Sequence, residues 1–263
     1  MLLTLDVGNS TIHQGIFRDE EMIFQDRSET PTEDFSTNQL HKFFSDLFLK
    51  SHYHHMIKHV AVTSVVPYIE DDLKVCVSKC FGCQSFFLHS SMQDFLKFAV
   101  SQPNEIGADR IAACIAAVNQ FPGRDILVID MGTATVFDIV LKDRKYLSGA
   151  IFPGIEISLN SLVTNTAQLS LVNVSKPKKV IGKDTKTNLQ SGLYYGHLGA
   201  LKEIKNLILS EIGKHRRDIV TIATGGFAYL FDKNGLFDFI IPSLVLKGTK
   251  IAFDLNQTNR NHV

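Results

Sequence analysis

The chain has 263 residues, 44% hydrophobic and 21% charged, which is typical of a soluble globular protein with one large domain or two modest ones. Lysine plus arginine equals aspartate plus glutamate at 27 each, so no overall basic field exists to bind nucleic acid or an anionic membrane. The first residues lack the basic start of a signal peptide, and no apolar run approaches the roughly 18 residues of a membrane-spanning helix. We therefore expect a cytoplasmic protein.

The predicted elements alternate along the chain. Strands are expected at short apolar runs: residues 2–5, 58–66, 85–89, 126–129 and 219–223. Helices are expected at residues 32–49 (capped by Thr32 or Ser36), 69–81, 108–120, 154–163 and 187–214. The polar tail 256–263 is expected to be disordered. The elements divide near Pro122 into two halves, residues 1–121 and 122–263, each a mixed sheet with helices.

An internal repeat is the strongest signal of organisation. Residues 2–23 align without a gap to residues 126–147, at an offset of 124. Each copy has an apolar strand that ends in Asp (Asp6 or Asp130), a turn of the form D-x-G-[NT]-x-T, a second apolar strand, a charged tip and a third strand. A shared strand pattern alone does not readily place the Asp-x-Gly turn and the charged tip in register.

The turn residues suit phosphate chemistry. Glycine lets the backbone approach a ligand closely, and the N–H groups that follow it can donate to phosphate oxygens. An Asp carboxylate at the end of the strand is placed to hold a hydrated Mg²⁺ that bridges to phosphates. A single copy would be read more simply as a hairpin turn, because Asp and Gly are common turn residues. Two copies in register favour a polyphosphate site.

These turns resemble those of the acetate-and-sugar-kinase/actin superfamily, and the whole motif set resembles the type III pantothenate kinases. The residues that carry the resemblance occur in the family's order over nearly the whole chain: 6–10 (DVGNS), 64–67 (SVVP), 107–110 (GADR), 130–134 (DMGTA), 149–154 (GAIFPG) and 182–185 (GKDT). The resemblance implies an α/β fold of two duplicated ribonuclease-H-like (actin-like ATPase) halves. It also implies ATP-dependent phosphorylation of pantothenate to 4′-phosphopantothenate, the first step of coenzyme A biosynthesis.

The resemblance assigns roles residue by residue. The residues implied to bind ATP are Asp6, Val7, Gly8, Asn9, Ser10, Thr11, Ile12, His13 and Thr133. Those implied to bind pantothenate are Gly107, Ala108, Asp109, Arg110 and Thr185, with Asp109 as the catalytic base. Asp130 is implied to bind a monovalent cation, K⁺ or NH₄⁺, while Mg²⁺ accompanies ATP. Residues 224–226 resemble the loop beneath the adenine.

The residue types of the Gly107–Arg110 motif agree with these roles. An alcohol that attacks a phosphoryl group needs a proton acceptor, and a carboxylate suffices because the transition state is loose. The planar fork of Arg110 can pair with a substrate carboxylate. Without the family, Asp109 and Arg110 are equally well read as a helix cap and a surface charge. Val100 stands where many members have a tyrosine, so that contact is absent or supplied otherwise.

The helix 108–120 is apolar on more than one face, which requires burial. It can pack inside one chain, and the resemblance suggests that it also lies in a homodimer interface. Two other functions remain open: another small-molecule kinase of the superfamily, or a nucleotide-binding accessory factor in transcription. An intact Asp109 disfavours the second, because a pure binding protein has no use for a proton acceptor.

Two clusters of possible metal ligands are read as structural. Cys76, Cys80 and Cys83 have the C-x3-C-x2-C spacing of radical-SAM iron–sulfur sites, but no barrel pattern surrounds them. Cys76 and Cys80 fit better as buried residues one helical turn apart. His55 and His59 have the spacing of a zinc helix but lack the glutamate of that motif and an obvious third ligand.

Overall fold

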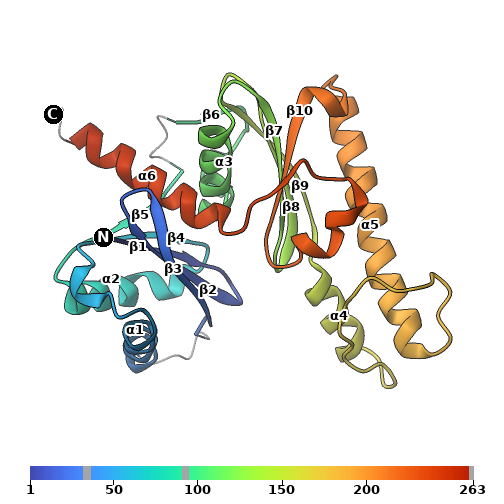
Figure 1. Cartoon of the computed structure of the whole chain (residues 1–263), viewed down its shortest axis with the longest axis horizontal. Coiled ribbons are helices and arrows are strands. Elements are labelled where there is room, and N and C mark those ends of the chain that lie inside the picture. Colours follow the sequence, from blue (N-terminus) through green and yellow to red (C-terminus); the bar gives the residue numbers. More distant parts are fainter. Residues whose placement is uncertain (32–36, 91–94, 261–263) are drawn as a thin grey trace. The chain divides into compact units, whose positions relative to one another are not determined.

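The computed structural model describes residues 1–31, 37–90 and 95–260, and the predicted caps Thr32 and Ser36 lie outside them. Two compact units make up the chain (Figure 1). The first contains Met1–Leu96, Ser101–Ala116 and Leu244–Val263, and the second contains Lys97–Val100 and Ala117–Ser243. The C-terminal helix thus groups with the N-terminal sheet, whereas a single boundary near Pro122 assigned it to the second half.

The first unit is built on a mixed sheet of strand order β3-β2-β1-β4-β5. Its strands are β1 (Leu2–Val7), β2 (Thr11–Arg18), β3 (Glu21–Glu29), β4 (His59–Ser64) and β5 (Ser85–Phe87). The pairs β1/β2 and β2/β3 are antiparallel, while β1/β4 and β4/β5 are parallel. The helices are α1 (Thr37–Ser51), α2 (Pro67–Phe81) and α6 (Leu244–Arg260). Figure 1 shows α1 and α2 on one side of this sheet and α6 on the other.

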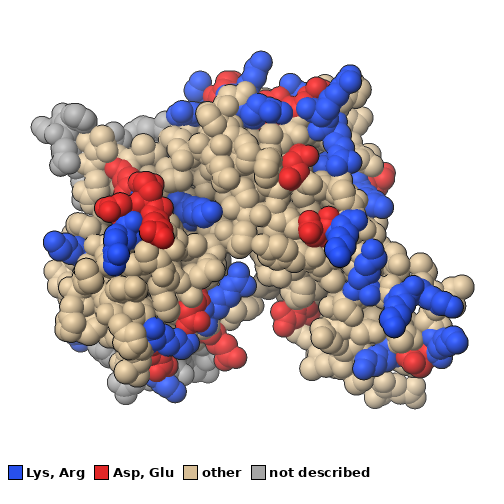
Figure 2. All heavy atoms as spheres, in the orientation of Figure 1, with Lys and Arg blue, Asp and Glu red and all other residues tan. Residues whose placement is uncertain are grey.

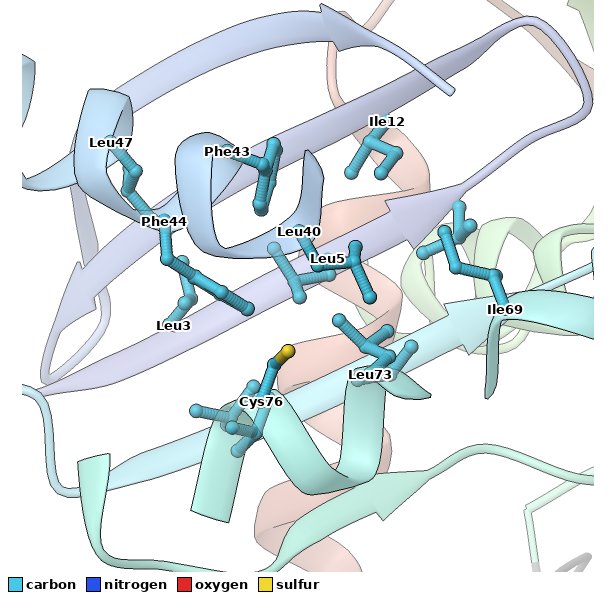
Figure 3. Packing of buried hydrophobic residues seen from close by; sticks show 14 of the residues in the cluster. Leu3, Leu5, Ile12, Leu40, Phe43, Phe44, Leu47, Ile69, Leu73 and Cys76 are labelled. Atoms are coloured by element: carbon cyan, nitrogen blue, oxygen red, sulfur yellow. The ribbon is translucent and has the colours of Figure 1, made fainter. Parts of the chain in front are cut away.

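The core of this unit lies between the sheet and the helices α1 and α2 (Figure 3). Alternate strand residues such as Leu3 and Leu5 point to one face, where they meet Phe44 of α1 and Leu73 of α2. Cys76 is fully buried in the same cluster, which confirms its prediction as a core residue. Burial raises the pKa of the Cys76 thiol. The opposite face packs through a smaller cluster on α6 that includes Leu246 and Phe253.

The second unit repeats this sheet. Its strands are β6 (Lys97–Phe98), β7 (Asp125–Met131), β8 (Ala134–Val140), β9 (Lys145–Pro153), β10 (Ile219–Thr224) and β11 (Phe239–Ile240), in the order β11-β10-β7-β8-β9-β6. Read from β9, the order and directions match β3-β2-β1-β4-β5, and β6 is an added edge strand. The helices α4 (Ile155–Thr164) and α5 (Thr185–Glu211) pack on the core cluster of Leu127, Ile129 and Phe137.

In the described part of the chain, the remaining elements are α3 (Ala108–Gln120), whose residues fall in both units, and four short 3₁₀ helices. The 3₁₀ helices are η1 (His54–Met56), η2 (Pro103–Glu105), η3 (Arg216–Asp218) and η4 (Ala228–Asn234). Local signals set the helix ends. Pro67 opens α2 at its first position, and Gly82 ends it in the left-handed conformation. None of the described helices combines the length and apolar character needed to cross a membrane.

Strand register corrects the gapless alignment of the two copies. The strands β1 and β2 pair Val7 with Ile12, whereas β7 and β8 pair Met131 with Thr135. The first turn therefore holds residues 8–11 and the second only residues 132–134. Consequently the residues of β8 correspond to those of β2 at an offset of 123. The neighbouring strands β7 and β9 correspond to β1 and β3 at an offset of 124. The identity of Thr11 and Thr135 in sequence is not an equivalence in structure.

Two further predictions change in the structure. The tail 256–263 was expected to be disordered, but residues 256–260 continue α6, and residues 261–263 lie outside the described part. Packing of α6 on the sheet stabilises a helix that its polar C-terminal sequence does not announce. The predicted strand 58–66 is shorter, His59–Ser64. The helix 108–120 is confirmed with its bounds unchanged.

Candidate active site

The first turn connects β1 to β2 and is held by a third strand. The Gly8 N–H donates to the Thr11 carbonyl at 3.0 Å, which closes the turn. Thr30, just after β3, donates its N–H to the Ser10 carbonyl at 3.1 Å and its hydroxyl to the Gly8 carbonyl at 2.6 Å. Asn9, Ser10 and Thr11 are exposed. The turn therefore presents polar side chains on a backbone that is fixed by long-range hydrogen bonds.

Asp6 lies between two polar neighbours on adjacent strands. It is directly opposite His13 of β2 and Thr63 of β4. Directly opposite residues share one face of a sheet, so the three side chains form a row. Burial lowers the pKa of His13 to about 4, assisted by the charge of Arg27 and opposed by a hydrogen bond with Gln25. His13 is therefore neutral at physiological pH.

The Gly-Ala-Asp-Arg motif joins this end of the sheet through Val65. The Val65 N–H donates to the Val7 carbonyl at 3.0 Å, and a Cβ atom on Gly107 would lie 3.3 Å from Val65 Cγ1. The same Cβ atom would lie 2.4 Å from Asp109 Oδ1, so the carboxylate packs directly against the glycine and would have to turn away from a larger residue. Asp109 Oδ1 accepts the Arg110 N–H at 2.7 Å, in the first turn of α3. The structure thus brings the first turn and this motif together within one unit.

The second turn is tighter and is enclosed by glycine loops. The Gly132 N–H donates to the Ala134 carbonyl at 3.0 Å, and the Gly154 N–H donates to the Thr133 carbonyl at 3.0 Å. Gly154 thus occupies the place of Thr30 in the first copy. A Cβ atom on Gly154 would lie 2.2 Å from the Thr133 carbonyl oxygen, so no side chain fits there.

Asp130 of the second turn lies against the loop that follows β10. Asp130 is paired with Thr224, and Gly225 has a φ of +87°. A Cβ atom on Gly225 would lie 2.5 Å from both Asp130 Oδ1 and the Met131 carbonyl oxygen. Two oxygen atoms of different types therefore converge beside Gly225. Carboxylate and carbonyl oxygens are the atom types that bind hard cations in proteins.

Thr185 belongs to a separate part of the second unit, at the start of α5. Asp184 caps this helix by accepting the Thr187 N–H at 2.8 Å, and this contact lowers the pKa of the Asp184 carboxyl. Thr185 lines an open pocket of about 300 Å³. The other lining residues are Gln168, Ser170, Val172, Asp184, Lys186 and Leu189. The first unit thus brings together the first turn and Gly107–Arg110. The second unit holds two separate parts of the predicted site, the second turn with Gly225 and the Thr185 pocket.

Sequence reasoning missed three positions beside the first turn: Arg27, Thr30 and Thr63. None lies in a recognisable motif, and Thr30 is 22 residues from the glycine it binds. The sequence offers one signal for Thr30, a polar residue at the end of the predicted third strand. That signal does not identify the partner of Thr30, which only the strand register shows. Missed positions of this kind are set by β-sheet pairing, not by local pattern.

Solved structures with similar coordinates define the class of fold. One is a Campylobacter jejuni protein assigned to the Baf family of transcriptional activators, with a TM-score of 0.60 and 20% identity over 97% of this chain and 99% of that one. Another is the ROK hexokinase of Thermus thermophilus, with a TM-score of 0.51 and 11% identity over 98% and 99% of the two chains. At these identities the likeness shows the fold alone. The fold is that of kinases made of two duplicated ribonuclease-H-like halves, as predicted.

Sequence comparison identifies the family. The family model for type III pantothenate kinase matches residues 2–206. Type III pantothenate kinase 1 of Francisella tularensis (strain SCHU S4) is 44% identical over 254 residues, 96% of this chain and 97% of the relative. Type III pantothenate kinase of Legionella pneumophila (strain Corby) is 40% identical over 259 residues, 97% and 99% of the two chains. The chain belongs to the type III pantothenate kinase family, which confirms the resemblance of its motifs.

Proposed function

We propose that the protein transfers the γ-phosphoryl group of ATP to the primary hydroxyl of pantothenate, which yields 4′-phosphopantothenate for coenzyme A biosynthesis. Membership of a kinase family implies the use of ATP. The observation that carries the substrate is the Gly107–Arg110 motif, linked through Val65 to the first phosphate turn. A base beside a phosphate turn is the arrangement that phosphoryl transfer to an alcohol requires.

ATP binding is assigned to the first turn and to part of the second. Exposed Asn9 and Ser10, together with the turn's N–H groups, donate to phosphate oxygens. Asp6 is placed to hold the hydrated Mg²⁺ that accompanies ATP. Thr133 contributes a hydroxyl from the second turn, where it corresponds to Ser10. Residues 224–226 follow β10 beside Asp130 and are proposed to lie beneath the adenine.

Asp109 is the proposed general base. Its carboxylate accepts the pantothenate hydroxyl proton as the oxygen attacks the γ-phosphorus atom. Position in the first turn of α3 stabilises the negative form, because N–H groups at a helix start point toward an anion. Arg110 pairs with the pantothenate carboxylate through its planar fork. This ion pair between Arg110 and the substrate carboxylate would let the enzyme select pantothenate over an uncharged alcohol.

Asp130 and the Met131 carbonyl are the proposed donors for K⁺ or NH₄⁺, because their oxygens converge beside Gly225. Such a cation supplies positive charge near the phosphates when it is bound. The backbone around it is already fixed, since the Phe227 N–H donates to the Met131 carbonyl at 3.2 Å. This chain's part is to hold the Asp130 carboxylate beside that loop.

Thr185 is the proposed pantothenate contact from the second unit. Five lysines surround it in the segment 176–186, and all are exposed: Lys176, Lys178, Lys179, Lys183 and Lys186. Figure 2 shows mainly basic side chains over the part of the surface that residues 165–185 occupy in Figure 1, while the two charge types are interspersed elsewhere. A local positive field of this kind attracts anionic substrates such as pantothenate and ATP.

A homodimer remains a proposal, but its support changes. The helix α3 is already buried in one chain, since Ile111 through Val118 are each less than 10% exposed. It therefore has no free apolar face for a partner. Exposed apolar residues are instead concentrated between β9 and α5, at Ile151, Ile157, Leu162, Leu171, Val180 and Ile181. We propose these exposed side chains, rather than α3, as the candidates for a dimer contact.

The test is ADP release by the purified protein with ATP, Mg²⁺ and K⁺, with and without pantothenate. We expect pantothenate-dependent ADP and an equal amount of a phosphomonoester, detected by phosphorus NMR. Omission of K⁺ is expected to lower the rate. ADP formation that is independent of pantothenate, or that appears with other small alcohols only, would contradict the proposed function.

A further inference from the structure

The sheet of the first unit carries a row of four polar side chains one residue before the first turn. Strand register places Arg27 opposite His13, His13 opposite Asp6, and Asp6 opposite Thr63. Because directly opposite residues share a face, all four side chains lie on the face that Asp6 occupies. Arg27 belongs to no assigned motif, and His13 is the last residue of the implied ATP-binding segment 6–13.

The same row in the second unit is half apolar. There Ile151 is opposite Val136, Val136 is opposite Asp130, and Asp130 is opposite Thr224. The Asp and the Thr are common to both rows, and the difference is confined to the two outer strands. A shared framework therefore carries a cationic arm in the first copy and none in the second.

The Arg27 guanidinium has an electrostatic effect on the pKa of His13. Its charge is the second cause, after burial, that lowers the pKa of His13. This effect agrees with the strand register, which pairs Arg27 directly with His13. Gln25, two residues before Arg27 on the same strand, holds the ring by a hydrogen bond. Arg27 itself is exposed, and the strand register places it on the same face as Asp6.

The carboxylate adjacent to Arg27 in sequence is engaged on the other face of the sheet. Asp26 is adjacent in sequence but points to the opposite face, where its carboxylate binds Lys50 at 2.5 Å and Gln14 at 3.3 Å. Glu29 shares the face of Arg27 and lies opposite Thr11, at the exposed end of the strand. An exposed guanidinium on the face of the aspartate that precedes the phosphate turn can serve as a bidentate ligand for an oxyanion.

We propose that Arg27 binds the terminal phosphates of the nucleotide held by the first turn, and that His13, which lies between Arg27 and Asp6 in the row, positions it. This inference rests on the proposed function for the identity of the nucleotide, but it concerns a residue outside every assigned motif. It makes the first turn, rather than the second, the selective site for a triphosphate. Arg27 is a ligand to phosphate oxygens, whereas His13 acts through Arg27.

The experiment is titration of the full-length protein with ATP, ADP and AMP in the presence of Mg²⁺, by calorimetry. The variants are Arg27→Gln, Arg27→Lys and the control Arg18→Gln. Arg18 is exposed on the neighbouring strand and is paired with Glu21 at the far end of the hairpin. Thermal unfolding of each variant checks that the fold is intact.

We expect Arg27→Gln to weaken ATP binding about tenfold or more, ADP binding less and AMP binding not at all. Lysine should restore part of the loss, since it keeps the charge but not the fork, and Arg18→Gln should behave as the wild type. An equal loss for ATP and AMP, or no loss, would overturn the proposal. Because binding is measured without pantothenate, a failure here leaves the kinase assay untouched, and a failure of that assay leaves this result standing.

Discussion

The two copies of the strand–turn–strand unit show how one backbone design serves two tasks. Both place an Asp at the end of a central strand and a Thr beside it on the next parallel strand. The first turn is longer by the equivalent of Asn9, and a threonine holds it through a hydroxyl. The second is shorter, and a glycine holds it through the backbone alone. The two turns therefore differ both in length and in the group that holds them.

The largest expected effect concerns the base, which lies in the first unit only. Asp109→Asn is expected to lower kcat by about 10²- to 10⁴-fold, because the carboxamide cannot accept the hydroxyl proton. ATP affinity should be retained. Steady-state kinetics and calorimetry measure the two quantities, and Asp143→Asn, at the exposed hairpin tip of the second copy, is the control. Unchanged turnover would remove Asp109 from the mechanism.

The next prediction uses the neutral histidine that only the first copy contains. The folded pKa of His13, about 4, is below its ordinary value of 6.5. The unfolded chain therefore binds the proton first, and stability present above pH 6.5 is lost as the pH falls toward 4. The loss in the free energy of unfolding is about 3 kcal/mol at most.

Urea denaturation at pH 7.5 and pH 4.5 measures this loss. His13→Val, which copies Val136 of the second row, should reduce the difference between the two pH values. If the variant loses as much stability as the wild type on acidification, His13 is not the group responsible.

The third prediction compares the glycines of the two turns. In Gly154→Ala the new methyl would meet the Thr133 carbonyl at 2.2 Å, and we expect a loss of about 1–3 kcal/mol in the free energy of unfolding. In Gly8→Ala the nearest atom, the Thr11 carbonyl oxygen, is 3.2 Å away, so the loss should be smaller. Chemical denaturation of both variants ranks them. The reverse order would contradict the tighter second turn.

A smaller effect is expected at Thr30. Thr30→Val removes the hydroxyl that binds the Gly8 carbonyl, which should cost about 1 kcal/mol and raise the KM for ATP. Thr30→Ser keeps the hydroxyl and should resemble the wild type. Equal kinetics for the valine and serine variants would show that backbone contacts suffice, as they do in the second copy.

The smallest effect is expected from the lysine segment. Replacement of Lys176, Lys178 and Lys179 by Gln should lower kcat/KM for pantothenate a few-fold at low ionic strength, with little change in kcat. The difference should vanish at high salt, because the field is screened. Lys58, Lys79 and Lys233 replaced by Gln provide a control of equal charge. A loss that persists at high salt would indicate a direct contact instead.

The sequence by itself determined the duplication, the fold class and the family. Asp-x-Gly turns after apolar runs recur at one offset, and Gly107–Arg110 is a local motif, so both are readable without coordinates. The helix 108–120 was also predicted with its bounds unchanged, since its apolar residues and its ends are local signals. The roles of Asp6–His13, Asp109, Asp130 and Thr185 remain proposals that rest on these patterns.

Tertiary structure alone decided the register, the partners of the turns and the place of the last helix. A gapless alignment concealed the shorter second turn, because one residue lost there is regained at the hairpin tip before Lys145. Thr30 and Arg27 acquire their positions from pairing between strands, which no local pattern encodes. The helix α6 is polar near its end and forms because Leu246 and Phe253 pack on the first sheet. Local residues specify turns and motifs, but contacts distant in sequence decide what surrounds them.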